Sequence, residues 1–228
     1  MQLSLGLVLF GVSLAMLVGA DLGLDPWDVL HQGLATSFGA PLGAVVVVVS
    51  LLVLALWIPL RERAGPGTVL NAVVVGLVFE AAIGMLGDAE STVARWAFLV
   101  AAVVLNAVAT GMYVGAGLGP GPRDGLMTGL AARGHPIRLV RTAIEATVLA
   151  IGCLLGGSVG IGTIVFALAI GPLVHVALPI FTITNPQPEG QRHGQTISRS
   201  DHRQHTAATT RSAHRTMGDR HPRRPEGV

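Results

Sequence analysis

Six long apolar stretches constrain the fold of this chain more than any other feature of its sequence. They cover residues 3–20, 42–60, 68–86, 94–116, 137–156 and 162–182. A helix of about 20 apolar residues is long enough to cross the hydrocarbon core of a bilayer. A lone strand in lipid would leave its backbone polar groups unpaired, so spanning segments of this kind are helical. We therefore expect an all-α, polytopic membrane protein with six transmembrane helices.

Charge is distributed unevenly along the chain. Only 12% of the 228 residues are charged, against about a quarter in soluble domains. Residues 1–184 hold seven arginines and nine acidic residues, a net charge of −2. Residues 185–228 hold eight arginines and four acidic residues, a net charge of +4, and they contain no aromatic side chain. Because such a segment cannot bury a core, we expect residues 185–228 to be a disordered basic tail.

The arginines also predict an orientation in the membrane. Arg61 and Arg63 follow the second apolar stretch, a group of arginines surrounds the gap between the fourth and fifth, and the basic tail follows the sixth. Cytoplasmic loops carry the excess of Lys and Arg in membrane proteins. We therefore expect both termini to be cytoplasmic and the acidic connections, such as residues 87–94, to lie outside.

The sequence contains an internal repeat. Residues 19–35 and 115–131 are identical at ten of 17 positions, at an offset of 96, and Gly65 and Gly76 match Gly160 and Gly171 at an offset of 95. Self-similarity at a fixed offset indicates duplication. We divide the chain into two three-span repeats, residues 1–86 and 95–184, joined by an extracytoplasmic linker, residues 87–94. An odd number of spans per copy inverts the second copy, an arrangement found in secondary transporters.

Each repeat carries a short extra helix after its first span. Asp25-Pro26 and Gly121-Pro122 are typical of helix starts, with Pro at the first helical position. Asp28 and Asp124 lie two residues after these prolines and are expected to face the free amides. The helices, residues 26–37 and 122–133, are too short to span. They are either interfacial helices or re-entrant half-helices. Re-entrant helices would bring two positive ends together near the midplane and favour an anionic or polar solute.

Ionisable residues inside the spans mark a candidate solute site. Glu80 and His175 occupy equivalent repeat positions and could approach one another across a pseudo-two-fold axis, either to relay protons and hold a solute or to form a structural hydrogen bond. An ion pair at i, i+4 spacing accounts for Arg141 and Glu145. Asn106 is expected to join two helices through a hydrogen bond. The candidate substrate-binding residues are Asp28, Glu80, Arg123, Asp124 and His175.

Several functions and features are not expected. The chain has no nucleophile–base constellation, phosphate-binding loop or zinc motif, so we expect no enzyme, no cofactor and no metal site. Cys153 is the sole cysteine and is expected to be a small buried hydrophobe, and His31 and Gln32 are expected to face solvent. The expected partners are membrane lipids and a small-molecule solute, without nucleic acid, and a homodimer is compatible with so small a body.

The motifs resemble those of one family of bacterial membrane proteins. The resemblance to the YczE/YyaS/YitT family rests on Gly23–Leu30 with Gly33 and Leu34, on Gly65–Thr68 with Asn71 and Gly76, and on Gly119–Leu126 with Arg141 and Glu145. It covers residues from about 5 to about 178. It implies a multi-pass protein of the bacterial plasma (inner) membrane with five or six spans, and it carries over no substrate.

Two functions of different classes are consistent with the sequence. The first is a small-molecule transporter or exporter with its solute site between the two repeats. The second is a non-transporting membrane scaffold or regulatory protein that acts through partners or through its tail.

Overall fold

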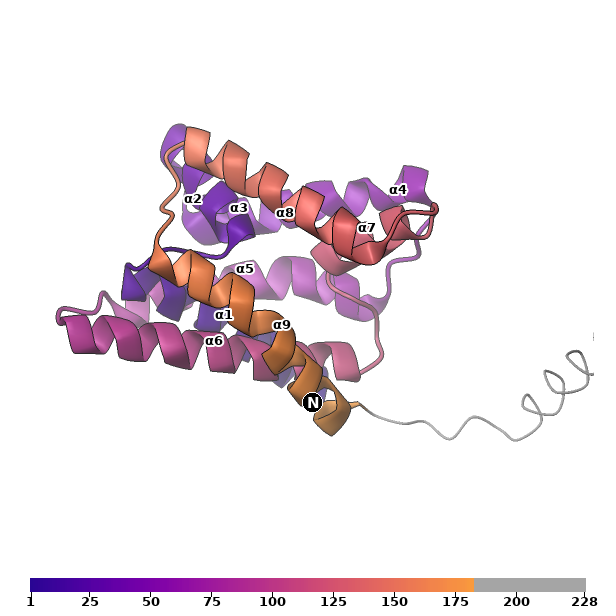
Figure 1. Cartoon of the computed structure of the whole chain (residues 1–228). Coiled ribbons are helices and arrows are strands. Elements are labelled where there is room, and N and C mark those ends of the chain that lie inside the picture. The colour runs from indigo at the N-terminus through magenta and orange to yellow at the C-terminus, as the bar shows by residue number, and fades with distance from the viewer. Residues whose placement is uncertain (183–228) are drawn as a thin grey trace, which may run out of the picture. The chain divides into compact units, whose positions relative to one another are not determined.

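The computed structural model describes residues 1–182, and every regular element within them is a helix (Figure 1). The all-α prediction is thereby confirmed, while the predicted tail, residues 185–228, lies outside the described residues. The helices are α1 (Gln2–Ala20), α2 (Pro26–Phe38), α3 (Leu42–Ala55), α4 (Trp57–Leu60), α5 (Pro66–Leu86), α6 (Thr92–Gly115), α7 (Pro122–Ala131), α8 (Ile137–Leu154) and α9 (Ile161–Phe181).

Five helical segments are long and apolar enough to cross a membrane. They are α1, the segment Leu42–Leu60 formed by α3 and α4, and the helices α5, α6 and α9. The remaining long helix, α8, has 18 residues and carries Arg138, Arg141 and Glu145. With these three charged residues, α8 is not among the helices that are apolar enough to cross a membrane.

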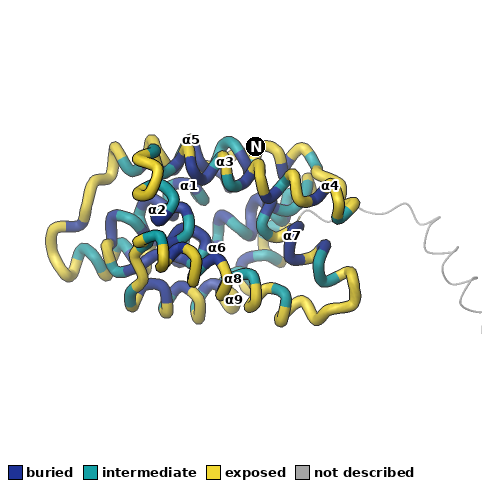
Figure 2. The backbone as a smooth tube through the Cα atoms, turned by 90° about the horizontal axis from the view of Figure 1, so that it is seen from above, coloured by how far each residue is buried: buried dark blue, intermediate teal, exposed yellow. Residues whose placement is uncertain are grey.

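The centre of the bundle is the antiparallel pair α1 and α6. Gly6, near the start of α1, lies against the backbone of Ala109 and Tyr113, whereas Gly19, near its end, lies against Phe98. Small residues let the two backbones approach closely. The Asn106 side chain donates a hydrogen bond to Ser13 Oγ at 3.0 Å, which confirms the predicted interhelical role of Asn106. Helix α5 packs on α1 and α9 packs on α6, and the buried residues gather around this centre (Figure 2).

Two matching contacts connect the ends of the central helices to the flanking ones. After α1 the chain turns inward, and Gly162 N at the start of α9 donates to the Leu22 carbonyl at 2.6 Å. After α6, Gly67 N at the start of α5 donates to the Leu118 carbonyl at 2.9 Å. The sequence offsets of 96 and 95 relate these two contacts to one another. Each segment that follows a central helix is therefore fixed to the flanking helix of the other half of the chain.

The short helices α2 and α7 begin inside the bundle. Because α1 and α6 are antiparallel, their last residues lie at opposite ends of a pair that is about 28 Å long over the 19 residues of α1. Nevertheless Arg123, the second residue of α7, lies 3.8 Å from Asp25, the N-cap of α2. Both connections must return from opposite ends toward the middle. The two half-helices therefore begin near one another inside the bundle.

The flanking helices are packed differently in the two halves. Gly76 of α5 lies against the carbonyl of Gly43 on α3, and Gly43 N donates to Glu80 Oε2 at 2.6 Å. Among the described residues, α8 and α9 have no comparable packing, and the space beside Gly171, the counterpart of Gly76, is open. Figure 1 shows α8 and α9 separated along their lengths.

The expectation that Cys153 is buried is wrong. Cys153 is exposed on the surface of α8. Helix α8 buries only Val148 and Gly152, on the face that packs against α2, and Cys153 is one residue, or about 100°, away from the latter. An apolar neighbourhood in the sequence therefore did not predict burial, because a helix in lipid also exposes apolar residues.

We predict that Gly76→Ala lowers the thermal unfolding midpoint of the detergent-purified protein. A Cβ atom at Gly76 would lie 2.5 Å from Val47 Cγ2 and 2.6 Å from the Gly43 carbonyl oxygen. Overpacking of this kind costs about 1–3 kcal/mol, which exceeds the gain of about 0.5–1 kcal/mol from replacing a helical glycine by alanine. Gly171→Ala is the matched control and should leave the midpoint unchanged or raise it. Equal effects of the two substitutions would contradict the different packing of the two halves.

Candidate functional site

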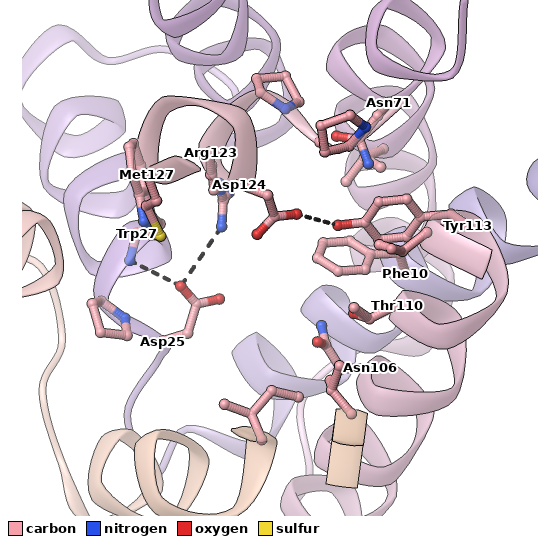
Figure 3. Close-up of a pocket in the computed structure, with 18 of the residues that line it drawn as sticks. Phe10, Asp25, Trp27, Asn71, Asn106, Thr110, Tyr113, Arg123, Asp124 and Met127 are labelled. Carbon is pink, nitrogen blue, oxygen red and sulfur yellow. Dashed lines mark hydrogen bonds and ion pairs between the residues drawn. The ribbon is translucent and has the colours of Figure 1, made fainter. Parts of the chain in front are cut away.

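A cavity of about 410 Å³ lies where the starts of α2 and α7 meet the middle of the central helices (Figure 3). Phe10 of α1 and Asn106 of α6 lie near the midpoints of their helices, and both line it. Asp25 and Arg123 contribute the starts of the two half-helices. The cavity is therefore at mid-depth in the bundle, not at one of its ends.

Equivalent positions of the two halves line this cavity. The offsets of 96 and 95 relate the lining residues in pairs, which include Phe10 and Asn106, Val46 and Arg141, Ser50 and Glu145, Asn71 and Phe166, and Val75 and Ile170. Several pairs join an apolar residue to a polar one. The two halves thus line the cavity with equivalent positions but with residues of different polarity. One side can therefore hold a polar group and another side an apolar one.

Arg123 joins the two half-helices electrostatically. Its guanidinium nitrogens lie 3.5 Å from Asp28 Oδ1 and 3.8 Å from Asp25 Oδ1, and its Cζ atom lies 5.2 Å from the centroid of the Trp27 ring. Asp28 is fully buried behind Arg123, while Asp25 faces the cavity. One guanidinium is therefore shared by two buried carboxyl groups.

The free backbone amides at the start of α2 are hydrogen-bonded by the side chain of its own N-cap residue, Asp25. Asp25 Oδ1 accepts from Trp27 N at 2.9 Å and from Asp28 N at 3.1 Å, which confirms the predicted cap at Asp25. Asp28 does not face these amides as expected. Since the free donors already have a carboxylate partner, the positive end of α2 is not available to an anionic solute.

Burial changes the acid–base properties of this cluster. It raises the pKa of Asp25 to about 7, with a further contribution from the negative charge of Asp28 and an opposing one from Arg123. Burial also raises the pKa of Asp28. Asp25 can therefore exchange a proton near neutral pH, at the wall of the cavity.

His31 belongs to this cluster, and the expectation that it faces solvent is wrong. It is fully buried, and its Nδ1 lies 2.8 Å from Asp28 Oδ1. Burial, aided by the positive charge of Arg123, lowers the pKa of His31 well below its usual range and so favours the neutral ring. The spacing of three residues places Asp28 and His31 on one helical face, and this signal was present in the sequence. Gln32 is half-buried and its Oε1 accepts from Ser158 N at 2.6 Å.

Asp124 is the carboxylate most open to the cavity. It is exposed there, and Tyr113 donates its hydroxyl to Asp124 Oδ2 at 2.7 Å (Figure 3). No arginine pairs with Asp124 within the described part of the chain. The start of α7 that carries Asp124 is held in place because Trp57 Nε1 donates to the Pro122 carbonyl at 3.1 Å.

Glu80 and His175 lie away from the cavity. Glu80 is exposed and is bonded to Gly43 N, and His175 is exposed on α9. No ion pair joins them in the portion that the structure describes, because α5 and α9 flank different central helices. The structure therefore brings together three of the five predicted site residues, Asp28, Arg123 and Asp124, and leaves Glu80 and His175 outside.

Carboxylates outnumber guanidinium groups around the cavity. Glu145 and Arg141 of α8 form the predicted pair, with Nε to Oε1 at 2.8 Å, and cancel one another. Of the other ionisable groups, Arg123 pairs with Asp25 and with the buried Asp28, and Asp124 lines the cavity without an arginine partner among the described residues. The site is therefore electrostatically complementary to a cation or to a donor of several hydrogen bonds. Residues 1–182 contain no cluster of His, Cys, Asp and Glu side chains suited to a metal ion.

The helices and the cavity define a multi-pass membrane protein of all-α architecture. Over residues 1–179 the chain matches a family of unknown function, DUF6198, and it belongs to that family. It is 37% identical, over 76% of its length and 80% of the relative's, to an uncharacterized protein of Haemophilus influenzae. It is 34% identical, over 75% of its length and 80% of the relative's, to the uncharacterized membrane protein YczE of Bacillus subtilis, which confirms the family resemblance. No solved structure matches the chain.

We predict that Arg123→Met destabilises the protein by about 3–5 kcal/mol, the usual cost of removing one partner from a buried ion pair. The substitution leaves Asp25 and Asp28 without their shared counter-charge. The double variant Arg123→Met, Asp28→Asn should recover a large part of the loss, as measured by thermal unfolding in detergent. If the second substitution lowers the stability further, Arg123 does not stabilise the protein through Asp28.

Proposed function

We propose that this protein is a secondary transporter that binds a small organic cation in the cavity between its two halves. The observation that carries the proposal is the position and charge of this cavity. It lies at mid-depth, it is lined by equivalent positions of both halves, and it has more carboxylates than guanidinium groups. Transporters built from inverted repeats hold their substrates at such a site, beside the starts of broken helices.

The proposal includes six spans and two inverted repeats. The matching contacts of Leu22 with Gly162 and of Leu118 with Gly67 support a two-fold relation between the halves. Helix α8 is the counterpart of α3 and would be the sixth span, with Arg141 and Glu145 turned to the cavity. With the arginine-rich connections inside, both termini lie in the cytoplasm of a bacterial cell.

In this proposal the polar residues have distinct roles. Asp124 receives the positive group of the solute, and Tyr113 holds the Asp124 carboxylate in place. Asn71, Asn106 and Thr110 line the cavity and offer hydrogen bonds to other polar groups of the solute. Arg123 keeps the two half-helices together. Asp25, which exchanges a proton near neutral pH, provides a means of coupling solute binding to proton binding.

We predict that Asp124→Asn weakens the binding of organic ammonium ions at least about tenfold, a loss of about 1.4 kcal/mol. The amide keeps the size of the side chain and removes the charge that the cation requires. The measurement is calorimetric titration of the purified protein with a panel of primary and quaternary ammonium ions. Asp88→Asn, at an exposed position outside the cavity, is the matched control and should bind as the wild type does. Wild-type affinity in Asp124→Asn would refute the assigned site.

A variant truncated after residue 184 separates the proposal from the scaffold alternative. The cavity lies wholly within residues 1–182, so cation binding should persist without the tail. A complete absence of binding in the full chain, together with loss of cellular function on truncation, would favour the scaffold.

We predict that cation affinity rises as pH rises through about 7. Below this pH Asp25 is protonated and neutral, and above it the carboxylate adds a negative charge to the site. The cation affinities of the wild type measured at about pH 6 and about pH 8 should therefore differ severalfold. In Asp25→Asn the difference should largely disappear, while the cap on α2 is kept because Asn is also a good N-cap residue. An unchanged pH dependence in Asp25→Asn would assign the proton to another group.

A further inference from the structure

The cavity reaches the surface of the bundle on one side, between α8 and α9. Arg141 and Glu145 of α8 line it while their side chains are 51% and 30% exposed. Gly171 of α9 lines it too and is exposed, with nothing within 4 Å of the position of a Cβ atom. The equivalent gap between α3 and α5 is closed by the contact of Gly43 with Gly76. The opening faces sideways along the spans, toward the space that lipid would occupy.

The two walls of this opening differ in polarity. The α9 wall presents Phe166, Ile170 and Val174 to the cavity, whereas the α8 wall presents the Arg141–Glu145 pair. An ion pair that faces hydrocarbon is costly, so charged residues in spans face water, a partner or a ligand. This opening is therefore poorly suited to lipid chains alone and well suited to a molecule with both a polar and an apolar part.

Helix α9 is built to bend beside this opening. Pro172 and Pro179 lie inside the helix, and Pro172 follows Gly171 directly. Proline removes one backbone hydrogen bond and weakens the helix at that point. The equivalent of Pro172 in α5 is Leu77, which keeps its N–H. Helix α9, which would have to move to admit a ligand, is thus the wall that contains the two prolines.

We propose that the cleft between α8 and α9 is a lateral entrance through which an amphiphilic organic cation passes from the membrane into the cavity. This inference rests on the proposed function and specifies its substrate class. The ammonium group binds at Asp124, and the apolar chain lies along Phe166, Ile170 and Val174 and extends out between the helices. A cation without an apolar chain lacks this second contact and binds more weakly.

The test compares two probes with the same head group, tetramethylammonium and dodecyltrimethylammonium, binding to the full chain in nanodiscs of zwitterionic lipid. Wild-type protein should bind the long-chain probe at least about tenfold more tightly after correction for its partition into empty nanodiscs. Gly171→Trp should reduce that preference to a few-fold by lowering the affinity for the long-chain probe, because the indole would occupy the cleft beside Gly171, where nothing lies within 4 Å of the position of a Cβ atom. Gly84→Trp, at another open helical glycine that does not line the cavity, is the matched control and should behave as wild type.

The other outcomes separate this inference from the proposed function. Equal affinity for both probes, or a long-chain preference that survives in Gly171→Trp, would overturn the lateral entrance while the cation site stands. If neither probe binds to folded wild-type protein, both proposals fail. If Gly171→Trp converts a dimer into a monomer, as measured by light scattering, the cleft is a subunit interface and the entrance is refuted.

Discussion

The ion cluster of Arg123 with Asp25 and Asp28 is the interaction on which the inner architecture depends. Two chain segments arrive from opposite ends of the α1–α6 pair, and each begins a half-helix in the middle of the bundle. The start of α2 carries the carboxyl groups of Asp25 and Asp28, and the Arg123 guanidinium at the start of α7 supplies the opposite charge. With α1 and α6 packed through glycine on one side, this arrangement leaves a cavity instead of a filled core.

The flanking helices pack closely in one half of the chain and stand apart in the other. One flanking pair, α3 and α5, is closed by Gly43, Gly76 and the Glu80 hydrogen bond, and the other, α8 and α9, is parted. In a protein with two equivalent halves, exchange of these two conformations would close one side and open the other. In transporters built from inverted repeats, alternating access is largely a rocking or gating of one repeat against the other around a fixed site. The closed pair thus indicates how the open pair could pack in a second state.

Much of the fold could be predicted from residue patterns because lipid imposes a simple rule on apolar stretches. The helix starts at Asp25-Pro26 and Gly121-Pro122 followed from local capping chemistry, and both are present. The ionisable residues were harder to place. Glu80 and His175 were selected because charge inside a span is costly, but the cost disappears when the side chain bonds a helix start or reaches the surface.

Other parts of the site depend on tertiary packing that local patterns do not contain. Burial of His31 depends on how α2 packs within the bundle, and the bond from Trp57 to Pro122 joins residues far apart in the chain. The role of Tyr113 depends on the turn between α6 and α7, which brings Asp124 within hydrogen-bond distance of its hydroxyl. A sequence identifies Asp124 as a helix-start residue, but only the fold shows that its carboxylate opens into a cavity.

The central claim is that the two halves are inverted, and the sidedness of the two half-helix ends tests it most directly. Ser37 near the end of α2 and His135 after α7 are both exposed. Single cysteines at these positions, introduced after Cys153→Ser removes the only native thiol, would be treated with a membrane-impermeant maleimide in intact cells. The account predicts that Ser37→Cys is labelled in intact cells and that His135→Cys is labelled only after the membrane is permeabilised. Labelling of both positions from the same side would contradict the inverted arrangement.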